Sequence, residues 1–411
     1  MKLSEFNYPF FCNNQEGIFN TFSGSIVLFD SAVESPLKTP LCDMDSDLIR
    51  KYQKLGIVVE EFFDEKRVLL KSRRDVINRK TRPFFRILTT TGCNANCFYC
   101  YEGKRLVANL RLDVADAIIK FIVDNLNGFH QIGIQWFGGE PLVNYPVITY
   151  INDKLAEHGV EIFNSMISNA SLFNGDIIDL AVNKWHLQHI QITLDGYGEE
   201  HNIRKRYTNL ENAFDQTIQN VKNLVDKGVK VSLRLNYDYK NINSVNQLID
   251  YLSKEFRDNP YIVCYAYHIF DNANYDGEVP KLVDTYNINK RIVDAGLNKR
   301  AWLFRILKRR KGLCGFCSKN TIVINPDGTL LKCSLDENSV IGNVYGLMEH
   351  NIYSAWTSEH LDKRCNSCIF LPLCQGGCRA SMRNNYTNCC KMNSELLDEV
   401  LKDYIADIYC D

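Results

Sequence analysis

Apolar and polar positions alternate along residues 81–300 in the pattern of six strand-and-helix pairs. Six apolar runs have strand length and end in polar or glycine-containing stretches, and they span 84–90, 131–137, 161–168, 188–194, 230–236 and 261–269. Segments between them, such as 112–126 and 212–228, carry apolar residues at helical spacing. Strict alternation of strands and helices predicts a parallel sheet with right-handed crossovers. Six pairs are too few for a closed eight-unit barrel, so we predict an α/β fold with an open, partial (β/α)6 barrel.

A smaller unit is predicted before this core, at residues 1–80. The run 17–30 has a Ser-Gly turn between apolar stretches, which is typical of a hairpin. Residues 45–55 have the pattern of a capped helix that Gly56 ends, and a short strand follows. These features indicate a small α+β N-terminal module.

Residues 301–411 differ from both preceding parts because they are rich in cysteine and in turn residues. Within them, 321–333 has the pattern of a short hairpin and 393–408 that of a final helix. A chain of 411 residues is long enough for two or three domains. We therefore expect three domains, at 1–80, 81–300 and 301–411.

Composition and charge narrow the range of partners. Lys and Arg number 48 against 49 for Asp and Glu, so no charge excess favours nucleic acid or an acidic membrane surface. Residues 1–20 lack the continuous apolar core of a secretory signal, and no window approaches the roughly 18 apolar residues of a membrane span. The expected location is cytoplasmic, with no nucleic-acid partner and no membrane partner.

The chain has 16 cysteines, an unusual number for a cytoplasmic protein. A reducing compartment disfavours disulfides, and clustered spacing favours metal binding. Three cysteines lie within 93–100 and nine within 314–390. The four isolated cysteines, which we expect to be small buried apolar residues, are Cys12, Cys42, Cys264 and Cys410.

Polar or glycine-rich motifs follow the first four predicted strands of the barrel. They are the cysteine loop 93–100, the Gly-Gly-Glu motif at 138–140, the Ser-Asn pair at 168–169 and the Asp-Gly pair at 195–196. The carboxyl ends of parallel strands meet at one rim of a barrel, where active sites lie. We therefore expect these four motifs to form a single site.

Cys93, Cys97 and Cys100 form a C-x3-C-x2-C motif without a nearby fourth cysteine. Three thiolates on one loop can bind three irons of a four-iron cluster and leave the fourth iron open to a small molecule. The alternative is a zinc loop with a distant fourth ligand, although this spacing is not typical of zinc sites. The spacing also differs from the ferredoxin run, in which the first three cysteines are two residues apart.

With Tyr99 before Cys100, the motif resembles the signature of the radical S-adenosylmethionine (SAM) superfamily. In that family the open iron chelates the amino and carboxylate groups of SAM. An electron from the cluster splits the sulfonium C–S bond, and the resulting 5′-deoxyadenosyl radical removes a hydrogen atom from the substrate. The resemblance implies a [4Fe-4S] cluster held by the three cysteines, SAM as cofactor, and an electron donor such as ferredoxin or flavodoxin.

The other motifs of the rim resemble the SAM contacts of the same family. Gly138, Gly139 and Glu140 resemble its motif for the methionine ammonium group; glycines let the backbone approach a ligand, and a carboxylate accepts a charge-assisted hydrogen bond. The resemblance implies ribose and carboxylate contacts from Ser168, Asn169, Thr193 and Asp195.

Arg204 resembles a family arginine that pairs with the SAM carboxylate. Lys205 and Arg206 follow it directly, so the sequence does not decide which of these basic residues corresponds to the family arginine. The alternative interpretation is that the segment is a solvent-exposed run of charges.

The cysteine order in the last hundred residues resembles the SPASM extension of the superfamily. It comprises a G-x4-C motif at 328–333, a C-x2-C-x5-C-x3-C motif at 365–378 and a Cys-Cys pair at 389–390. The resemblance implies two auxiliary four-iron clusters. One would be held by Cys314, Cys317, Cys333 and Cys378, and the other by Cys365, Cys368, Cys374 and either Cys389 or Cys390. A pair of zinc ribbons is the alternative, because C-x2-C is also common in zinc sites.

SPASM proteins mostly modify peptides or proteins, so the resemblance implies a precursor peptide as substrate. We expect an oxidoreductase that matures a ribosomally synthesised peptide through an oxidative cross-link, such as a thioether or a carbon-linked ring. Residues 1–80 would then either bind the leader of that peptide, by strand addition at a sheet edge, or merely pack on the barrel.

Three alternatives stay open at the level of sequence. An anaerobic sulfatase-maturing enzyme would carry an aspartate directly after the G-x4-C cysteine, but Ser334 stands there and Asp336 follows two residues later. A peptide epimerase would need a hydrogen donor such as Cys264. A non-catalytic zinc or electron-transfer protein belongs to a different class altogether.

Overall fold

The computed structural model describes residues 1–29, 35–103, 106–269, 275, 277–310, 313–346, 350–358, 361–383 and 390–409. Two of the cysteines discussed above, Cys389 and Cys410, lie outside these ranges. The chain forms two compact units. The first unit comprises 1–79, 300–314 and 358–411, and the second comprises 80–299 and 315–357.

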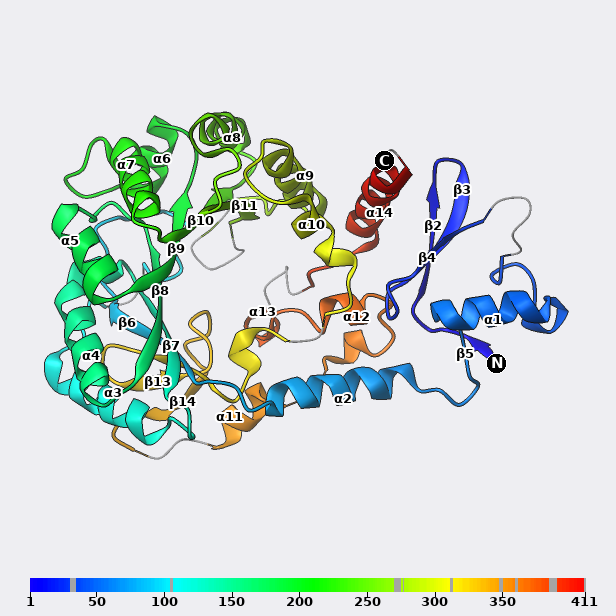
Figure 1. The fold of residues 1–411 in the computed structure, drawn as a ribbon, viewed down its shortest axis with the longest axis horizontal. Coiled ribbons are helices and arrows are strands. Elements are labelled where there is room, and N and C mark those ends of the chain that lie inside the picture. Colours follow the sequence, from blue (N-terminus) through cyan, green and yellow to red (C-terminus); the bar gives the residue numbers. More distant parts are fainter. Residues whose placement is uncertain are drawn as a thin grey trace. The chain divides into compact units, whose positions relative to one another are not determined.

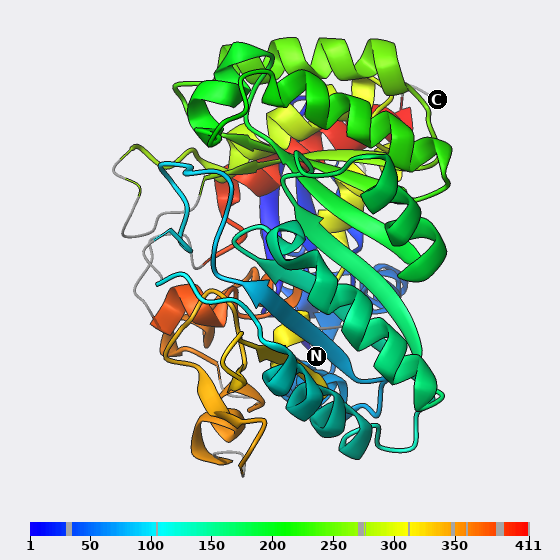
Figure 2. The ribbon, with the colours of Figure 1, turned by 90° about the vertical axis from the view of Figure 1, so that its left-hand side faces the viewer.

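The second unit is built on a curved, mostly parallel sheet (Figures 1 and 2). Its six parallel strands are β6 (Phe84–Thr90), β7 (Gln131–Gly138), β8 (Glu161–Ser168), β9 (Leu187–Leu194), β10 (Lys230–Tyr237) and β11 (Ile262–His268). They follow one another in the sheet in chain order, and β6 and β11 do not pair, so the barrel is open. The predicted α/β class and open six-unit barrel are confirmed.

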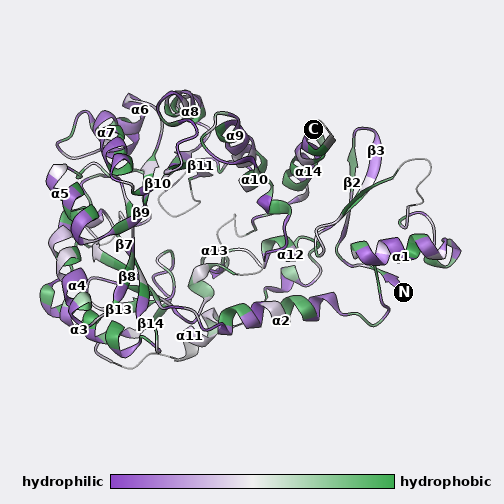
Figure 3. Cartoon of the chain, in the orientation of Figure 1, coloured by the Kyte–Doolittle hydropathy of each residue, from purple (hydrophilic) through white to green (hydrophobic). Residues whose placement is uncertain are grey.

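Helices cover the outer side of this sheet (Figure 1). The longer ones are α3 (Leu112–Asp124), α4 (Tyr145–Glu157), α7 (Ala213–Asp226), α8 (Ile242–Phe256) and α9 (Leu282–Asp294), and the shorter α5 (Gly175–Asp179) and α6 (Glu199–Lys205) lie between strands. In Figure 3, α7 carries both hydrophilic and hydrophobic residues, as an amphipathic helix should. The apolar faces of helices and sheet share one large buried core.

Each strand shows two different faces. On β10, Val231, Leu233 and Leu235 are buried in this core, whereas Ser232 and Arg234 between them are only half buried. Side chains of a strand alternate between faces, so the apolar residues face the helices and the polar residues face the inside of the barrel. The inner face can therefore hold polar ligands, and the outer face supplies the stability.

Three further strands extend the sheet beyond β6. They are β12 (Thr321–Ile324), β13 (Thr329–Leu331) and β14 (Val340–Asn343). The predicted hairpin at 321–333 is present as β12 and β13, but β12 also pairs in parallel with β6. The sequence did not indicate this pairing, because it joins segments more than 200 residues apart. Helix α11 (His350–Trp356) follows β14.

The first unit contains a three-stranded antiparallel sheet of β2 (Asn7–Cys12), β3 (Gln15–Asn20) and β4 (Ile26–Leu28). The predicted hairpin at 17–30 corresponds to β3 and β4, whereas β2 was not predicted. Asn13 and Asn14 connect β2 to β3 with φ of 50° and 62°. Positive φ at both central residues suits the tight turn that matches strand twist, and Asn tolerates it.

Helices complete the first unit, together with a two-stranded pair of β1 (Lys2–Leu3) and β5 (Val58–Val59). They are α1 (Ser46–Leu55), α2 (Glu65–Asn78), α10 (Arg300–Leu303), α12 (Leu371–Cys374), α13 (Arg379–Arg383) and α14 (Ser394–Tyr409). Helix α1 begins after the capping side chain of Asp45 and ends at Gly56, whose φ is 74°, as predicted. In the described part of the chain, no helix is both long and apolar enough to cross a membrane.

Candidate active site

The cysteine loop 93–100 follows β6 at the carboxyl edge of the sheet, as predicted. Backbone hydrogen bonds tie it to the segment after α6. The amide of Asn96 donates to the carbonyl of Lys205 (3.0 Å), and the amide of Thr208 donates to the carbonyl of Asn94 (2.9 Å). The loop thus has a fixed path, and its partner segment comes from the fourth strand–helix unit.

All three cysteines of the loop are free thiols, and no disulfide joins any of the described cysteines. Burial raises the pKa of Cys93 to about 12 and that of Cys97 to about 11, and it also raises the pKa of Cys100. The thiols therefore keep their protons at neutral pH until a metal displaces them.

The donor set fits an iron–sulfur cluster. The loop supplies three cysteines, yet among the described residues no three Cys, His, Asp or Glu side chains converge on a single ion. A cube of irons takes one thiolate per iron, so its thiolates need not converge, whereas a zinc ion requires them to. The arrangement is thus better suited to a cluster than to zinc.

Gly138 and Gly139 pack against the backbone at the start of the cysteine loop. A Cβ atom on Gly138, whose φ is 132°, would lie 2.0 Å from the carbonyl oxygen of Thr90. One on Gly139 would lie 2.3 Å from the carbonyl oxygen of Gly92. We expected these glycines to let a ligand approach the backbone; in the structure they let the cysteine loop approach it.

The fully buried carboxylate of Glu140 joins the second and third motifs of the rim. It accepts hydrogen bonds from the hydroxyl of Ser168 (2.8 Å) and from the amides of Asn169 (2.8 Å) and Leu142 (3.1 Å). Burial raises the pKa of Glu140 to about 7, and these hydrogen bonds partly oppose the shift. The side-chain amide of Asn169 lies 3.9 Å from the sulfur of Cys93, so the network reaches the cysteine loop.

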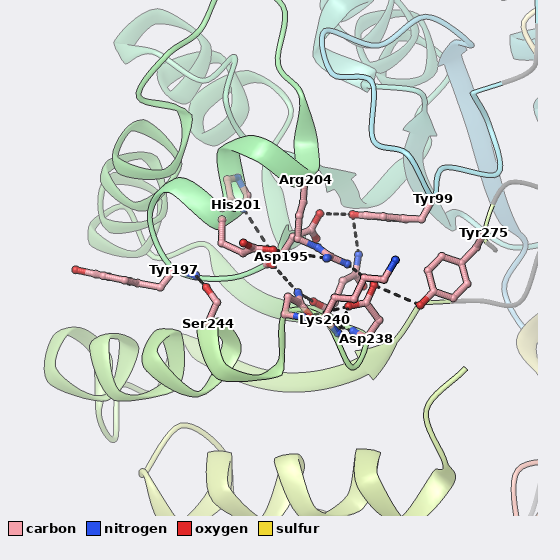
Figure 4. Close-up of polar contacts among 12 residues, drawn as sticks. Tyr99, Asp195, Tyr197, His201, Arg204, Asp238, Lys240, Ser244 and Tyr275 are labelled. Atoms are coloured by element: carbon pink, nitrogen blue, oxygen red, sulfur yellow. Dashed lines mark hydrogen bonds and ion pairs between the residues drawn. The ribbon is translucent and has the colours of Figure 1, made fainter. Parts of the chain in front are cut away.

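Asp195 joins the fourth motif to the same loop (Figure 4). Its Oδ2 accepts a hydrogen bond of 2.5 Å from the hydroxyl of Tyr99, and its Oδ1 lies 3.6 Å from Nζ of Lys205. Lys205 Nζ and Asn236 Nδ2 also contact the Tyr99 hydroxyl, at 3.3 and 3.1 Å. Because Asp195 and Lys205 are both buried, they form an internal ion pair beside the cysteines.

Arg204 is also buried, and its charge has partners within the protein. Its guanidinium lies 2.7 Å from Asp238 and 4.9 Å from the ring of Phe98 in the cysteine loop. Arg206, in contrast, is exposed. With Arg204 and Lys205 buried, the segment is not a solvated run of charges.

The structure thus brings most of the predicted residues to one rim. Thr193 lies on β9 two residues before Asp195 and is half buried, next to Arg234 of β10 in the register. The analysis of the sequence did not single out Asn236, near the end of β10, or Asp238, which follows this strand directly. The rule that polar residues at strand ends gather at the rim could have found both.

The C-terminal cysteines divide between the two units. Cys365, Cys368 and Cys374 belong to the first unit. Burial raises the pKa of Cys365, and the neighbouring thiols of Cys374 and Cys368 raise it further. Cys390 also belongs to this unit and is exposed. For the other predicted set, Cys314 and Cys378 belong to the first unit and Cys317 and Cys333 to the second. Both ligand sets remain predictions.

Two residues named for the alternative functions have clear surroundings. Ser334 accepts a hydrogen bond of 2.6 Å from Arg86 on β6, whose guanidinium lies over the ring of Phe137. Cys264 is fully buried in the core between sheet and helices, which raises its pKa. It therefore faces away from the inner side of the barrel.

Comparison with known proteins agrees with this geometry. Residues 87–252, which contain all four rim motifs including the cysteine loop, match the model of the radical SAM superfamily. This part of the chain is a radical SAM domain.

Two curated relatives illustrate the range of these radical SAM proteins. A cysteine-type anaerobic sulfatase-maturating enzyme of Clostridium novyi is 23% identical over 348 residues, which cover 73% of this chain and 88% of the relative. The radical SAM cyclopropyl synthase TigE of Paramaledivibacter caminithermalis is 22% identical and covers 83% of this chain and 80% of its own length.

Solved structures share the fold of this radical SAM protein. Native anSMEcpe with bound AdoMet has a TM-score of 0.62 at 17% identity, and the match covers 80% of this chain and 98% of that chain. SuiB of Streptococcus suis bound to S-adenosylmethionine has a TM-score of 0.56 at 15% identity and covers 93% of this chain and 97% of its own.

A buried histidine makes the stability of this radical SAM protein depend on pH. His201 is fully buried on α6, and its Nδ1 accepts a hydrogen bond of 3.2 Å from the amide of Asp195. Burial, aided by the charge of Lys205, lowers the pKa of His201 to about 3. Since the unfolded chain takes up this proton near pH 6.5, stability is complete above pH 6.5 and falls as the pH drops below it.

We expect His201→Asn, which keeps an acceptor near Nδ1, to lose less stability on acidification than the wild type. Because of this histidine, the free energy of unfolding of the wild type should be about 1.4 kcal/mol lower at pH 5.5 than at pH 7.5. Thermal unfolding at the two pH values measures the difference, with the exposed His158 replaced by Asn as control. Equal losses in the wild type and His201→Asn would contradict the prediction.

Proposed function

We propose that this radical SAM enzyme matures a ribosomally synthesised precursor peptide by forming an oxidative cross-link, either a thioether or a carbon-linked ring. The observation that carries the proposal is the three-cysteine loop embedded in a buried polar network at the rim of an open barrel. The fold likeness to SuiB extends over 93% of this chain, and SuiB also has a structure with its precursor peptide SuiA (TM-score 0.53). TigE, a cyclopropyl synthase, supports the same class of reaction.

The residues of the rim would hold the cofactors as follows. Cys93, Cys97 and Cys100 would bind a [4Fe-4S] cluster whose open iron takes SAM. When bound, this pair supplies the 5′-deoxyadenosyl radical that removes hydrogen from the substrate. The buried pair of Asp195 and Lys205 would fix Tyr99, and with it the last cysteine of the loop.

The remaining predicted contacts would surround SAM. Gly138 and Gly139 would hold the cysteine loop close to β7, and Glu140 would lie behind Ser168 and Asn169. Thr193 and Arg204 are the further proposed contacts of the ribose and the carboxylate.

We further propose that residues 301–411 are a SPASM domain with two auxiliary clusters. Burial of the ligands and hydrogen bonds to their sulfurs would set the potentials of these clusters. A cytoplasmic location and an electron donor such as ferredoxin or flavodoxin are part of this proposal.

The three-stranded sheet of the first unit would bind the leader of the peptide. Strand β2 is at the edge of this sheet, and its Phe11 is 67% exposed. An edge strand offers unpaired backbone groups to an extended peptide, and an exposed aromatic side chain adds apolar contact.

A sulfatase-maturing enzyme is the second candidate, favoured by the likeness to the Clostridium novyi enzyme and to anSMEcpe. The position of its base, however, holds Ser334, which is hydrogen-bonded to Arg86. A serine hydroxyl is far less basic than a carboxylate, so this site lacks the expected base. The buried position of Cys264 argues likewise against an epimerase that uses this thiol.

Mass spectrometry of peptides co-expressed with the enzyme tests the proposal. A short cysteine-rich or repeat-bearing peptide encoded beside this gene is expected to lose two hydrogens per cross-link under anaerobic conditions. Conversion of a Cys to an aldehyde would favour the sulfatase-maturing alternative, and an inverted residue at unchanged mass would favour an epimerase. Metal analysis distinguishes the proposed clusters from the zinc alternative. Three clusters require about twelve irons per chain, whereas a zinc protein would contain zinc instead.

A further inference from the structure

Helix α2 of the N-terminal module packs against the C-terminal cysteine segment within the first unit. Leu69 of α2 shares a buried cluster with Cys365 and Leu371. The hydroxyl of Thr21, which follows β3, donates a hydrogen bond of 2.6 Å to the carbonyl of Ile369. These contacts make the N-terminal module part of the wall around this cysteine segment.

Arg73 lies four residues after Leu69, on the same face of α2, and is only 3% exposed. Its Nη1 donates a hydrogen bond to the carbonyl of Gln375, between Cys374 and Cys378. A Cβ atom on Gly376 would lie 3.5 Å from the same nitrogen. The guanidinium therefore lies directly on the backbone between two predicted ligands.

The charge of Arg73 is therefore close to the predicted ligands. Leu69, one turn earlier on α2, packs with Cys365, and the carbonyl that accepts the hydrogen bond from Arg73 follows Cys374 directly in the chain. Removing a guanidinium from water is costly, and a nearby anion offsets that cost. Thiolate ligands outweigh the positive charge of an iron–sulfur core, so a cluster at this place would be such an anion.

We propose that Arg73 is the cation of the auxiliary cluster to which Cys365, Cys368 and Cys374 are assigned, and that its charge raises the reduction potential of that cluster. The inference rests on the proposed SPASM domain. Reduction adds one electron and no proton to the cluster, so it makes the site more negative. A fixed positive charge therefore stabilises the reduced form more than the oxidised form. Arg73 is thus a positioning residue for electron transfer, supplied by the N-terminal module.

Potentiometric titration monitored by electron paramagnetic resonance tests this role. The titration is done in full-length protein with Cys93, Cys97 and Cys100 replaced by Ala, so that only the auxiliary clusters contribute. Arg73→Gln keeps a hydrogen-bond donor and removes the charge. At a fixed potential we expect the ratio of reduced to oxidised cluster to fall about tenfold, as for unit charges roughly 10 Å apart at an effective dielectric constant of about 20. For a one-electron couple, tenfold corresponds to a shift of 59 mV.

Three controls make the result specific. Arg73→Lys should restore most of the potential, and Arg74→Gln, at the exposed neighbouring position on α2, should leave it unchanged. The signal of the second auxiliary cluster is recorded in the same titration, and it should shift less, because Cys378 is its only predicted ligand near Arg73 whereas Cys365 and Cys374 both lie by α2. An unchanged potential in Arg73→Gln would overturn the proposal.

The iron content of the Arg73 and Arg74 variants also tests the proposal. If Arg73→Gln loses iron while Arg73→Lys and Arg74→Gln retain it, the charge is required to hold the cluster, which supports the proposal. If Arg73→Lys loses iron too, the role is one of packing and the electrostatic proposal fails. Zinc, or no iron, in the parent protein would instead refute the proposed SPASM domain.

Discussion

Replacing Cys93, Cys97 and Cys100 together by Ala is expected to abolish formation of 5′-deoxyadenosine from SAM while most of the iron remains. The three thiols lie on one loop after β6, and that loop is tied to the segment after α6. Without thiolates the loop cannot hold an iron, so SAM has neither an anchor nor a source of electrons. The C-terminal cysteines are not altered by the replacement, so the auxiliary clusters that we propose for them should remain.

The measurement combines chromatographic detection of 5′-deoxyadenosine, with dithionite as reductant, and iron and sulfide analysis after anaerobic purification. Cys42→Ala is the matched control, because Cys42 is an exposed cysteine far from any motif. It should retain full activity and iron. Continued cleavage of SAM in the triple variant would show that the cysteine loop is not required for the reaction. Loss of all iron would argue against separate clusters in residues 301–411.

Gly138→Ala and Gly139→Ala are each expected to destabilise the protein by about 4 kcal/mol and to abolish SAM binding. The added methyl group would meet a backbone carbonyl at 2.0 Å in the first variant and at 2.3 Å in the second. Neither carbonyl can move independently, because one belongs to β6 and the other to the start of the cysteine loop. At Gly138 the positive φ adds backbone strain.

Thermal unfolding and equilibrium dialysis with SAM measure both effects. Gly175→Ala is the control, since a Cβ atom at this first residue of α5 has no atom within 4 Å. Its stability should be unchanged or slightly higher, because alanine has less conformational freedom in the unfolded chain. Wild-type stability in Gly138→Ala would mean that the ends of β7 and β6 are not in such close contact.

The two predictions concern different levels of the same site. The cysteines would supply the chemistry that we propose, whereas the glycines and the pair of Asp195 and Lys205 hold the loop in its position. A buried ion pair stabilises a protein only when its geometry is good, but breaking one is strongly destabilising. The hydroxyl of Tyr99 donates a hydrogen bond to Asp195 and accepts one from Asn236, and these two bonds hold the cysteine loop at the rim.

The sequence by itself determined the barrel strands and the motifs that identify the domain. Strands such as 84–90 and 161–168 were predicted with the bounds that the structure has, because parallel strands buried between helices read as continuous apolar runs. The spacing of Cys93, Cys97 and Cys100, with Tyr99 before the last cysteine, resembles the radical SAM signature, and the match of residues 87–252 to the family model confirms this prediction. The apolar runs and the cysteine spacing each depend only on residues that are close together in the chain, so they can be recognised from the sequence alone.

Only the tertiary structure decided which distant segments meet. It paired β12 with β6, placed Lys205 against Asp195, packed Gly139 against the start of the cysteine loop and put Arg73 beside the C-terminal cysteines. None of these contacts follows from periodicity or spacing, since each joins segments that are separated along the chain and its energy depends on burial. A charged residue such as Lys205 reads as solvent-exposed in the sequence, and only the fold shows that an acidic partner lies next to it in the interior.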